Sequence, residues 1–209
     1  MTSDVTFFFD PVCPFTWRTS RWVNSMADKR GLTVQWRLLS LATLNEGKEI
    51  PEQYRDGMAR GWRASRLLAA ADQRHGQDAM ARLYTEIGTR VHGFVGPGPR
   101  DGQPTGGRLI DTELLAEALA AADLPADLIE AADDTTLDDA VRESHAAGQA
   151  RVGTESGSPI VAFGDGPGFF GPVVVPVPDG ESAEKLFDAV RLLSAVPEFS
   201  ELKRSRNGF

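Results

Sequence analysis

Apolar and polar positions near the N-terminus predict a strand, a helix and a second strand. Residues 5–9 form a short apolar run, and residues 16–27 then carry apolar side chains at helical spacing. Residues 32–38 alternate in character and are rich in β-forming residues. A strand–helix–strand order implies that the two strands pair in parallel, with the helix packed on one face of the sheet.

Helical spacing dominates the middle of the chain, and strand character returns near its end. Helices are predicted over residues 51–74, 78–91, 111–122, 126–132, 136–150 and 182–195. Strands are predicted at 159–163 and 169–174, and the glycine-rich turn between them is typical of a hairpin. Pro51, Asp111 and Pro125 are suited to the starts of three of the helices.

This order of elements divides the chain into three parts. A β-α-β half is expected at residues 1–45, an all-helical insertion at 46–152, and a β-β-α half with a C-terminal tail at 153–209. The simplest assembly is one mixed sheet made from the two ends of the chain, with the helices inserted between them. The Gly- and Pro-rich stretch 93–107 is predicted to be a long loop, either a tolerated surface insertion or a lid or partner loop.

Charge and cysteine content exclude several functions. A net charge of −8 argues against a nucleic acid partner, because phosphate binding needs a basic face. No apolar run approaches the roughly 20 residues of a membrane span. The three histidines and the single cysteine are too scattered to suggest a metal site. The N-terminal residues lack the features of a secretory signal, and one cysteine cannot form an internal disulfide, so a cytoplasmic location is expected.

The single cysteine, Cys13, lies where the first predicted strand meets the first predicted helix. Backbone N–H groups and the helix dipole favour negative charge at such a junction, which predicts an acidic, reactive thiol. A lone cysteine is more often a buried apolar residue, but two neighbours favour the reactive interpretation. Pro14 suits the first turn of a helix, and the hydroxyl of Thr16 lies on the same helical face, where it can reach the sulfur. Thr16 also suits the helix start for structural reasons alone, and both roles can hold together.

A second group of candidates lies at residues 157–159. Since Cys13–Pro14 is present upstream, we predict a cis bond between Ser158 and Pro159 that faces the cysteine, with the Ser158 backbone offering hydrogen bonds to a substrate. No histidine is convincing as a general base from sequence alone: His92 ends a helix before the long loop, His145 sits inside a helix, and His75 precedes a glycine.

These motifs resemble a known family. The motif from Cys13 to Thr16 resembles the Cys-x-x-Cys of thioredoxin-like oxidoreductases, with threonine in place of the second cysteine. The wider chain resembles the actinobacterial mycothiol-dependent nitroreductase-like proteins of the DsbA family. The matching segments lie in order along nearly the whole chain, at residues 9–14, 19–22, 39–46, 51–60, 144–148, 157–159, 170–173 and 201–204.

The resemblance implies an α/β thioredoxin-like fold of the DsbA branch with an inserted all-helical subdomain. It also implies a cytoplasmic homodimer that carries out thiol–disulfide chemistry on a disulfide or electrophilic substrate. Mycothiol or another small thiol would be the co-substrate, with no tightly bound cofactor. On matching positions, the resemblance points to Phe15, Asn45, Tyr54 and His92 as pocket residues. Thr16 departs from the family's usual second cysteine, which puts dithiol chemistry in question.

Three hypotheses follow for the function. In the first, Cys13 is a single nucleophilic thiol whose adduct is released by a second small thiol. In the second, the chain is a transferase or isomerase like the kappa-class glutathione transferases and 2-hydroxychromene-2-carboxylate isomerases, in which Thr16 orients a bound thiol and no lasting adduct forms. In the third, it is a degenerate thioredoxin fold that binds peptides or acts as a chaperone. Substitution of Cys13 and titration with mycothiol separate the three.

Overall fold

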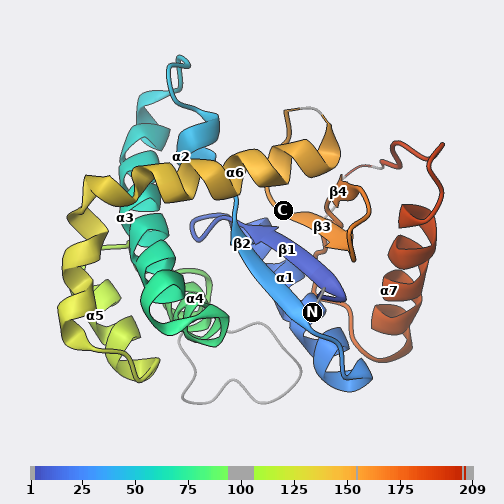
Figure 1. Cartoon of the computed structure of the whole chain (residues 1–209), viewed down its shortest axis with the longest axis horizontal. Helices are drawn as coiled ribbons and strands as arrows, with labels where there is room; N and C mark the ends of the chain where they lie inside the picture. The colour runs from blue at the N-terminus through green and yellow to red at the C-terminus, as the bar shows by residue number, and fades with distance from the viewer. Residues whose placement is uncertain (1–2, 94–105, 154, 204, 206–209) are drawn as a thin grey trace.

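Strands from the two ends of the chain form one four-stranded sheet in a computed structural model, which describes residues 3–93, 106–153, 155–203 and 205. The strand order is β2-β1-β3-β4, where the strands are β1 (Val5–Phe9), β2 (Val34–Leu38), β3 (Ile160–Phe163) and β4 (Gly168–Phe170). β1 pairs in parallel with β2 and antiparallel with β3, so the sheet is mixed, as the sequence predicts (Figure 1).

The predicted helices lie around this sheet in the expected order, and two short helices at 41–44 and 135–137 were not predicted as separate elements. The helices are α1 (Pro14–Arg30), α2 (Leu41–Leu44), α3 (Glu52–His75), α4 (Gln77–His92), α5 (Thr112–Ala121), η1 (Ala126–Asp133), η2 (Thr135–Leu137), α6 (Asp138–Val152) and α7 (Gly180–Ser194). In Figure 1, α3, α4 and α5 gather on the β2 side of the sheet and α7 stands beyond β3 and β4. Asp111 caps α5 as predicted, since its carboxylate accepts the N–H of Leu114 at 2.8 Å.

Alternate residues of β1 face two cores. Val5, Phe7 and Phe9 belong to the larger core, which also holds the indoles of α1. Phe8 points to the other face, where it joins Leu39 and Ile160 in a small cluster. α6 approaches that face closely, because a Cβ at Gly148 would lie only 2.9 Å from the Phe8 ring. The alternation of β1 therefore fixes both layers of the fold.

The structure corrects two of the predicted elements. β4 ends at Phe170 rather than at residue 174, because Pro172 has no N–H to donate to a neighbouring strand. The segment predicted as a helix at 126–132 is a 3₁₀-helix. Most of the loop predicted at 93–107 lies outside the described residues, but its ends meet, since the N–H of Gly107 donates to the Val91 carbonyl at 2.8 Å.

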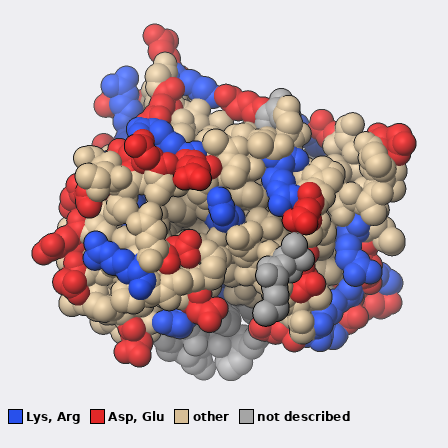
Figure 2. All heavy atoms as spheres, viewed as in Figure 1, with Lys and Arg blue, Asp and Glu red and all other residues tan. Residues whose placement is uncertain are grey.

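Charged side chains of both signs are interspersed over the face shown in Figure 2, which carries no broad basic surface. None of the helices in the described ranges has the length and apolar content needed to cross a bilayer.

Candidate active site

The turn between β1 and α1 holds Cys13 at the first position before the helix. Cys13 has an extended backbone (φ −85°, ψ 114°), and its carbonyl accepts the N–H of Trp17 at 3.0 Å to start α1. Pro14 follows at the first helical position, where a missing N–H costs nothing. Cys13 is 6 % exposed, so the strand and the helix bury the thiol at their junction.

The loop before β3 places a peptide carbonyl against the sulfur. The bond between Ser158 and Pro159 is cis, which confirms the prediction from sequence. The Cys13 thiol lies 3.7 Å from the Ser158 carbonyl oxygen and donates to it. A residue 145 positions away is thereby brought to the cysteine by the central pairing of β1 with β3.

Two hydroxyl groups, those of Thr16 and Ser158, lie near the thiol. Thr16 is fully buried, and its hydroxyl oxygen is 2.5 Å from that of Ser158. The Ser158 hydroxyl oxygen also accepts the N–H of Asp10 at 3.1 Å. The first turn of α1, the end of β1 and the cis-proline loop are therefore joined through one serine side chain.

Burial controls the ionisation of Cys13. It raises the pKa of the thiol above its ordinary value, and the nearby Asp10 carboxylate adds to the rise. The Thr16 side chain and the N–H groups of Thr16 and Phe15 lower the pKa, but they do not offset the burial. The expectation of an acidic thiol was therefore wrong, because the sulfur itself is buried and the hydrogen bonds at the helix start do not offset that burial.

His92 reaches the cysteine loop from the end of α4. Its Nε2 lies 2.9 Å from the Pro11 carbonyl oxygen, and its ring centroid is 6.3 Å from that of Trp17. The Trp17 indole N–H donates to the neighbouring Gly93 carbonyl at 2.9 Å. Burial lowers the pKa of His92, so the ring is neutral at pH 7 and donates from Nε2 to the carbonyl.

One face of α3 runs from solvent to the cysteine loop. Tyr54, Met58 and Gly61 share that face because they are spaced by four and three residues. A Cβ at Gly61 would lie 3.8 Å from a methyl group of Val12, next to the cysteine. Met58 contacts Asn45, whose amide nitrogen lies 3.8 Å from the sulfur and 2.8 Å from the Leu41 carbonyl oxygen. We call Tyr54, Met58, Asn45 and Gly61 the α3 wall.

The predicted site residues fall into two groups by location. The structure brings Thr16, Ser158, Pro159 and His92 to the cysteine loop, with Pro14 exposed and Phe15 half-buried on the first turn of α1. It places Asn45 and Tyr54 on the α3 wall instead. Tyr54 is 53 % exposed and stands two helical turns, about 10 Å, from Gly61.

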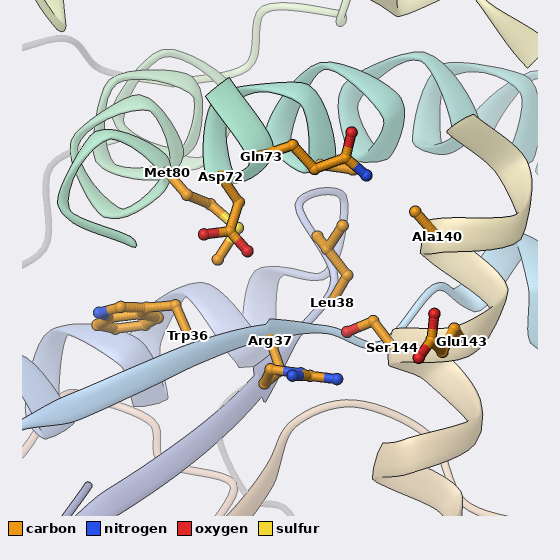
Figure 3. Close-up of a pocket in the computed structure, with 10 residues that line it drawn as sticks. Trp36, Arg37, Leu38, Asp72, Gln73, Met80, Ala140, Glu143 and Ser144 are labelled. Atoms are coloured by element: carbon orange, nitrogen blue, oxygen red, sulfur yellow. The ribbon is translucent and has the colours of Figure 1, made fainter. Parts of the chain in front are cut away.

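A separate hollow of about 200 Å³ lies between β2, α3, α4 and α6 (Figure 3). Trp36 and Arg37 of β2 line it, together with Asp72 of α3 and Glu143 of α6. None of the predicted site residues lines it. In the described part of the chain, no group of three His, Cys, Asp or Glu side chains could hold a metal ion.

The comparison with protein families fits this geometry. Residues 12–204 match the Rv2466c-like family, described as mycothiol-dependent nitroreductase Rv2466c. The chain belongs to this family. Members of the Rv2466c-like family are thiol-dependent oxidoreductases, so the chain is an enzyme of that class. A relative in Mycobacterium tuberculosis, the uncharacterized protein Rv2286c, is 34 % identical over 205 residues, which cover 97 % of this chain and 82 % of the relative.

Solved structures show that this Rv2466c-like protein has the DsbA-like thioredoxin fold. A probable DsbA oxidoreductase from Streptomyces coelicolor is 19 % identical over 97 % of this chain and 94 % of its own, with a TM-score of 0.56. The cytosolic disulfide reductase DsbM from Pseudomonas aeruginosa is 18 % identical over 90 % of this chain and 98 % of its own, with a TM-score of 0.55. Chlamydia trachomatis DsbA is 14 % identical over 92 % and 88 % of the two chains, with a TM-score of 0.55.

Asp10 is the residue of this site that sequence reasoning missed. It is fully buried, and its two carboxylate oxygens accept the N–H groups of Val12 at 2.7 Å and Leu41 at 2.6 Å. Burial raises the pKa of Asp10 to about 6, against these hydrogen bonds, which lower it. The available signal was an aspartate that directly ends a buried strand and comes two residues before an N–H that its side chain can bind.

Proposed function

We propose that this protein is a monothiol oxidoreductase in which Cys13 exchanges with disulfides of mycothiol. The observation that carries the proposal is the position of the Cys13 sulfur, 3.7 Å from the Ser158 carbonyl at the cis-proline, with Thr16 where the family's usual motif has a second cysteine. Such a site can form a mixed disulfide but has no second sulfur with which to release it.

Two exchange steps complete the reaction. The Cys13 thiolate attacks the mycothiol sulfur of a mixed disulfide, an S–S bond forms to Cys13, and the other sulfur leaves as a thiolate that takes up a proton. A second mycothiol, as thiolate, then attacks the mycothiol sulfur of the adduct and releases Cys13. The substrate disulfide is reduced, two mycothiols end as one mycothiol disulfide, and the enzyme is unchanged.

The surrounding residues suggest how the small thiol is held. The Ser158 backbone beside Pro159 would align the sulfur of the incoming thiol with Cys13. The remainder of the mycothiol molecule would contact four side chains: Phe15, Tyr54, Asn45 and His92. These residues stand at positions that match the family's pocket residues, and the α3 wall extends from Tyr54 to the cysteine loop. The neutral His92 would make its contact without adding charge to the site.

Intact-mass spectrometry tests the proposal. The protein is incubated with mycothiol disulfide, and a gain of one mycothiol per chain is expected. Cys13→Ser is a complete control because the chain has no other cysteine. Added mycothiol should then remove the adduct. A wild-type mass that does not change under these conditions would refute the monothiol mechanism.

A second candidate function is favoured by the raised pKa of Cys13. In a transferase or isomerase, the enzyme would bind a small thiol and activate it without becoming its covalent partner. The buried hydroxyls of Thr16 and Ser158 would then serve to orient that thiol. Turnover that survives Cys13→Ser would support this function over the first, and loss of turnover together with an adduct on the wild type would exclude it.

Assembly and location belong to the same proposal. We expect the protein to act as a homodimer in the cytoplasm, on the strength of the family resemblance and of its single cysteine. Sedimentation equilibrium tests the dimer. Calorimetric titration with mycothiol tests the remaining hypothesis of a peptide-binding module, which predicts no binding of the small thiol.

A further inference from the structure

The Asp10 carboxylate occupies the point where the three segments of the thiol site meet. Its Oδ1 accepts the Val12 N–H from the cysteine loop, and its Oδ2 accepts the Leu41 N–H from the start of α2. Its own backbone N–H donates to the Ser158 hydroxyl of the cis-proline loop. The carbonyl of Asp10 accepts the N–H of Cys13 at 3.2 Å, so the residue touches every segment around the sulfur.

We propose that Asp10 is a positioning residue for Cys13: its carboxylate holds the turn that presents the thiol to the Ser158 carbonyl. A negative charge this close to the sulfur also raises the pKa of the thiol. The proposal rests on the proposed function only in taking Cys13 as the exchanging group. A carboxylate suits the role because each oxygen accepts one of two N–H groups that face it from different segments.

No cation balances this charge at close range. Among the described residues, no Lys, Arg or His nitrogen lies within 4.0 Å of the Asp10 carboxylate oxygens. Cys13 and Tyr84 interact with the Asp10 charge, and His92 bonds to the carbonyl of the next residue, Pro11. Tyr84 and His92 are neutral at pH 7 because burial disfavours their charged forms. Arg21 stacks over the Trp17 ring at 4.1 Å and lies 5.8 Å from the centroid of the Tyr84 ring.

Because both groups are acids in a shielded environment, their ionisations oppose each other. Asp10 loses its proton near pH 6, well before Cys13 does, so Cys13 ionises next to a charge that is already present at neutral pH. Below that pH the thiol loses this repulsion and becomes relatively more acidic. An aspartate too far from the sulfur for their charges to interact would have no such effect.

The rate of alkylation by iodoacetamide between pH 5 and 10 measures this coupling, and it requires no mycothiol. For the wild type, the logarithm of the rate should rise with pH but flatten near pH 6, where Asp10 ionises. Asp10→Asn should remove the flattening and shift the thiol midpoint to lower pH. The same variant should exchange with a small disulfide at alkaline pH roughly tenfold more slowly, because the amide group cannot accept both N–H groups and the thiol is displaced.

A matched control is Asp4→Asn, since Asp4 also binds a backbone N–H, that of Thr33, but lies at the exposed end of β1. It should leave both measurements unchanged. Identical alkylation profiles for wild type and Asp10→Asn would overturn the proposal. If Asp10→Asn does not fold, the wild-type profile alone decides, and a straight line through pH 6 overturns it. Neither result depends on whether mycothiol is the co-substrate, so the proposed function stands or falls separately.

Discussion

The hydroxyl of Thr16 lies 2.5 Å from the hydroxyl of Ser158, next to Cys13, the single cysteine of the chain. In the Cys-x-x-Cys motif that this site resembles, a second cysteine would stand at residue 16. The hydroxyl pair uses that position to join helix α1 to the cis-proline loop. The residue that would be the second redox cysteine of the motif is here Thr16, which helps to position a single thiol.

Replacement of Thr16 by cysteine should restore a dithiol site. The sulfur would stand at the spacing from which a helix start presents two cysteines to each other, so oxidised Thr16→Cys should contain an internal disulfide. A mixed disulfide on Cys13 should then be resolved within the chain. Mass spectrometry after alkylation counts the free thiols, and none is expected after oxidation.

The matched control for this variant is Thr19→Cys. Thr19 is also buried on α1, but it lies six residues from Cys13 and its hydroxyl contacts the Pro172 carbonyl at 2.7 Å. In Thr19→Cys, the new cysteine and Cys13 should both remain free thiols. Persistence of both thiols in oxidised Thr16→Cys would show that the two side chains do not approach as the motif suggests.

The alkylation rate of the wild-type thiol should reach its maximum only at a pH above that of an ordinary thiol. Burial raises the pKa of Cys13, so the reactive thiolate is scarce at pH 7 and the rate should continue to climb beyond about pH 8.5, the midpoint of an ordinary thiol. Thr16→Val should move the midpoint still higher, because it removes a hydrogen bond that lowers the pKa. A midpoint below that of glutathione measured in parallel would contradict the buried environment.

Elements were easier to predict than the site, for physical reasons. The apolar runs of β1 and β3 and the spacing of the long helices are local signals, so the mixed sheet followed from sequence. The cis bond at Pro159 also followed, because the motif at Cys13 requires a partner loop. The burial of the Cys13 thiol did not, since it depends on how α1 and the turn at Asp10 pack against the cis-proline loop, which lies about 150 residues further along the chain.

Stability should depend on the ionisation of Asp10. Its pKa is about 6 in the folded protein and near 3.8 when unfolded, so between these values the unfolded chain releases a proton that the folded chain retains. The free energy of unfolding therefore falls as the pH rises through this window. Relative to Asp10→Asn, the wild type should lose about 3 kcal/mol between pH 3 and pH 7.

Urea denaturation of both proteins across that pH range measures the difference and cancels the contributions of other carboxylates. The variant also loses one hydrogen-bond acceptor, which shifts its stability equally at all pH values. Only the change with pH reports the buried charge. A difference that stays constant from pH 3 to pH 7 would mean that Asp10 ionises as it does in water.

The contact between α4 and α1 should be the least tolerant of added volume. A Cβ at Gly88 would lie 2.3 Å from the ring of Trp17, which is itself packed against Tyr84 at 5.7 Å between centroids. Gly88→Ala must therefore push the indole away, and overpacking of this kind costs about 1–3 kcal/mol. The same substitution at Gly57 of α3 meets nothing within 4 Å and should raise stability by up to about 1 kcal/mol, because alanine favours a helix. Urea denaturation of the two variants compares them directly. Equal stabilities of the two variants would mean that α4 is free to move away from α1. Since Trp17 also lies next to His92, Gly88→Ala should slow disulfide exchange at Cys13 as well.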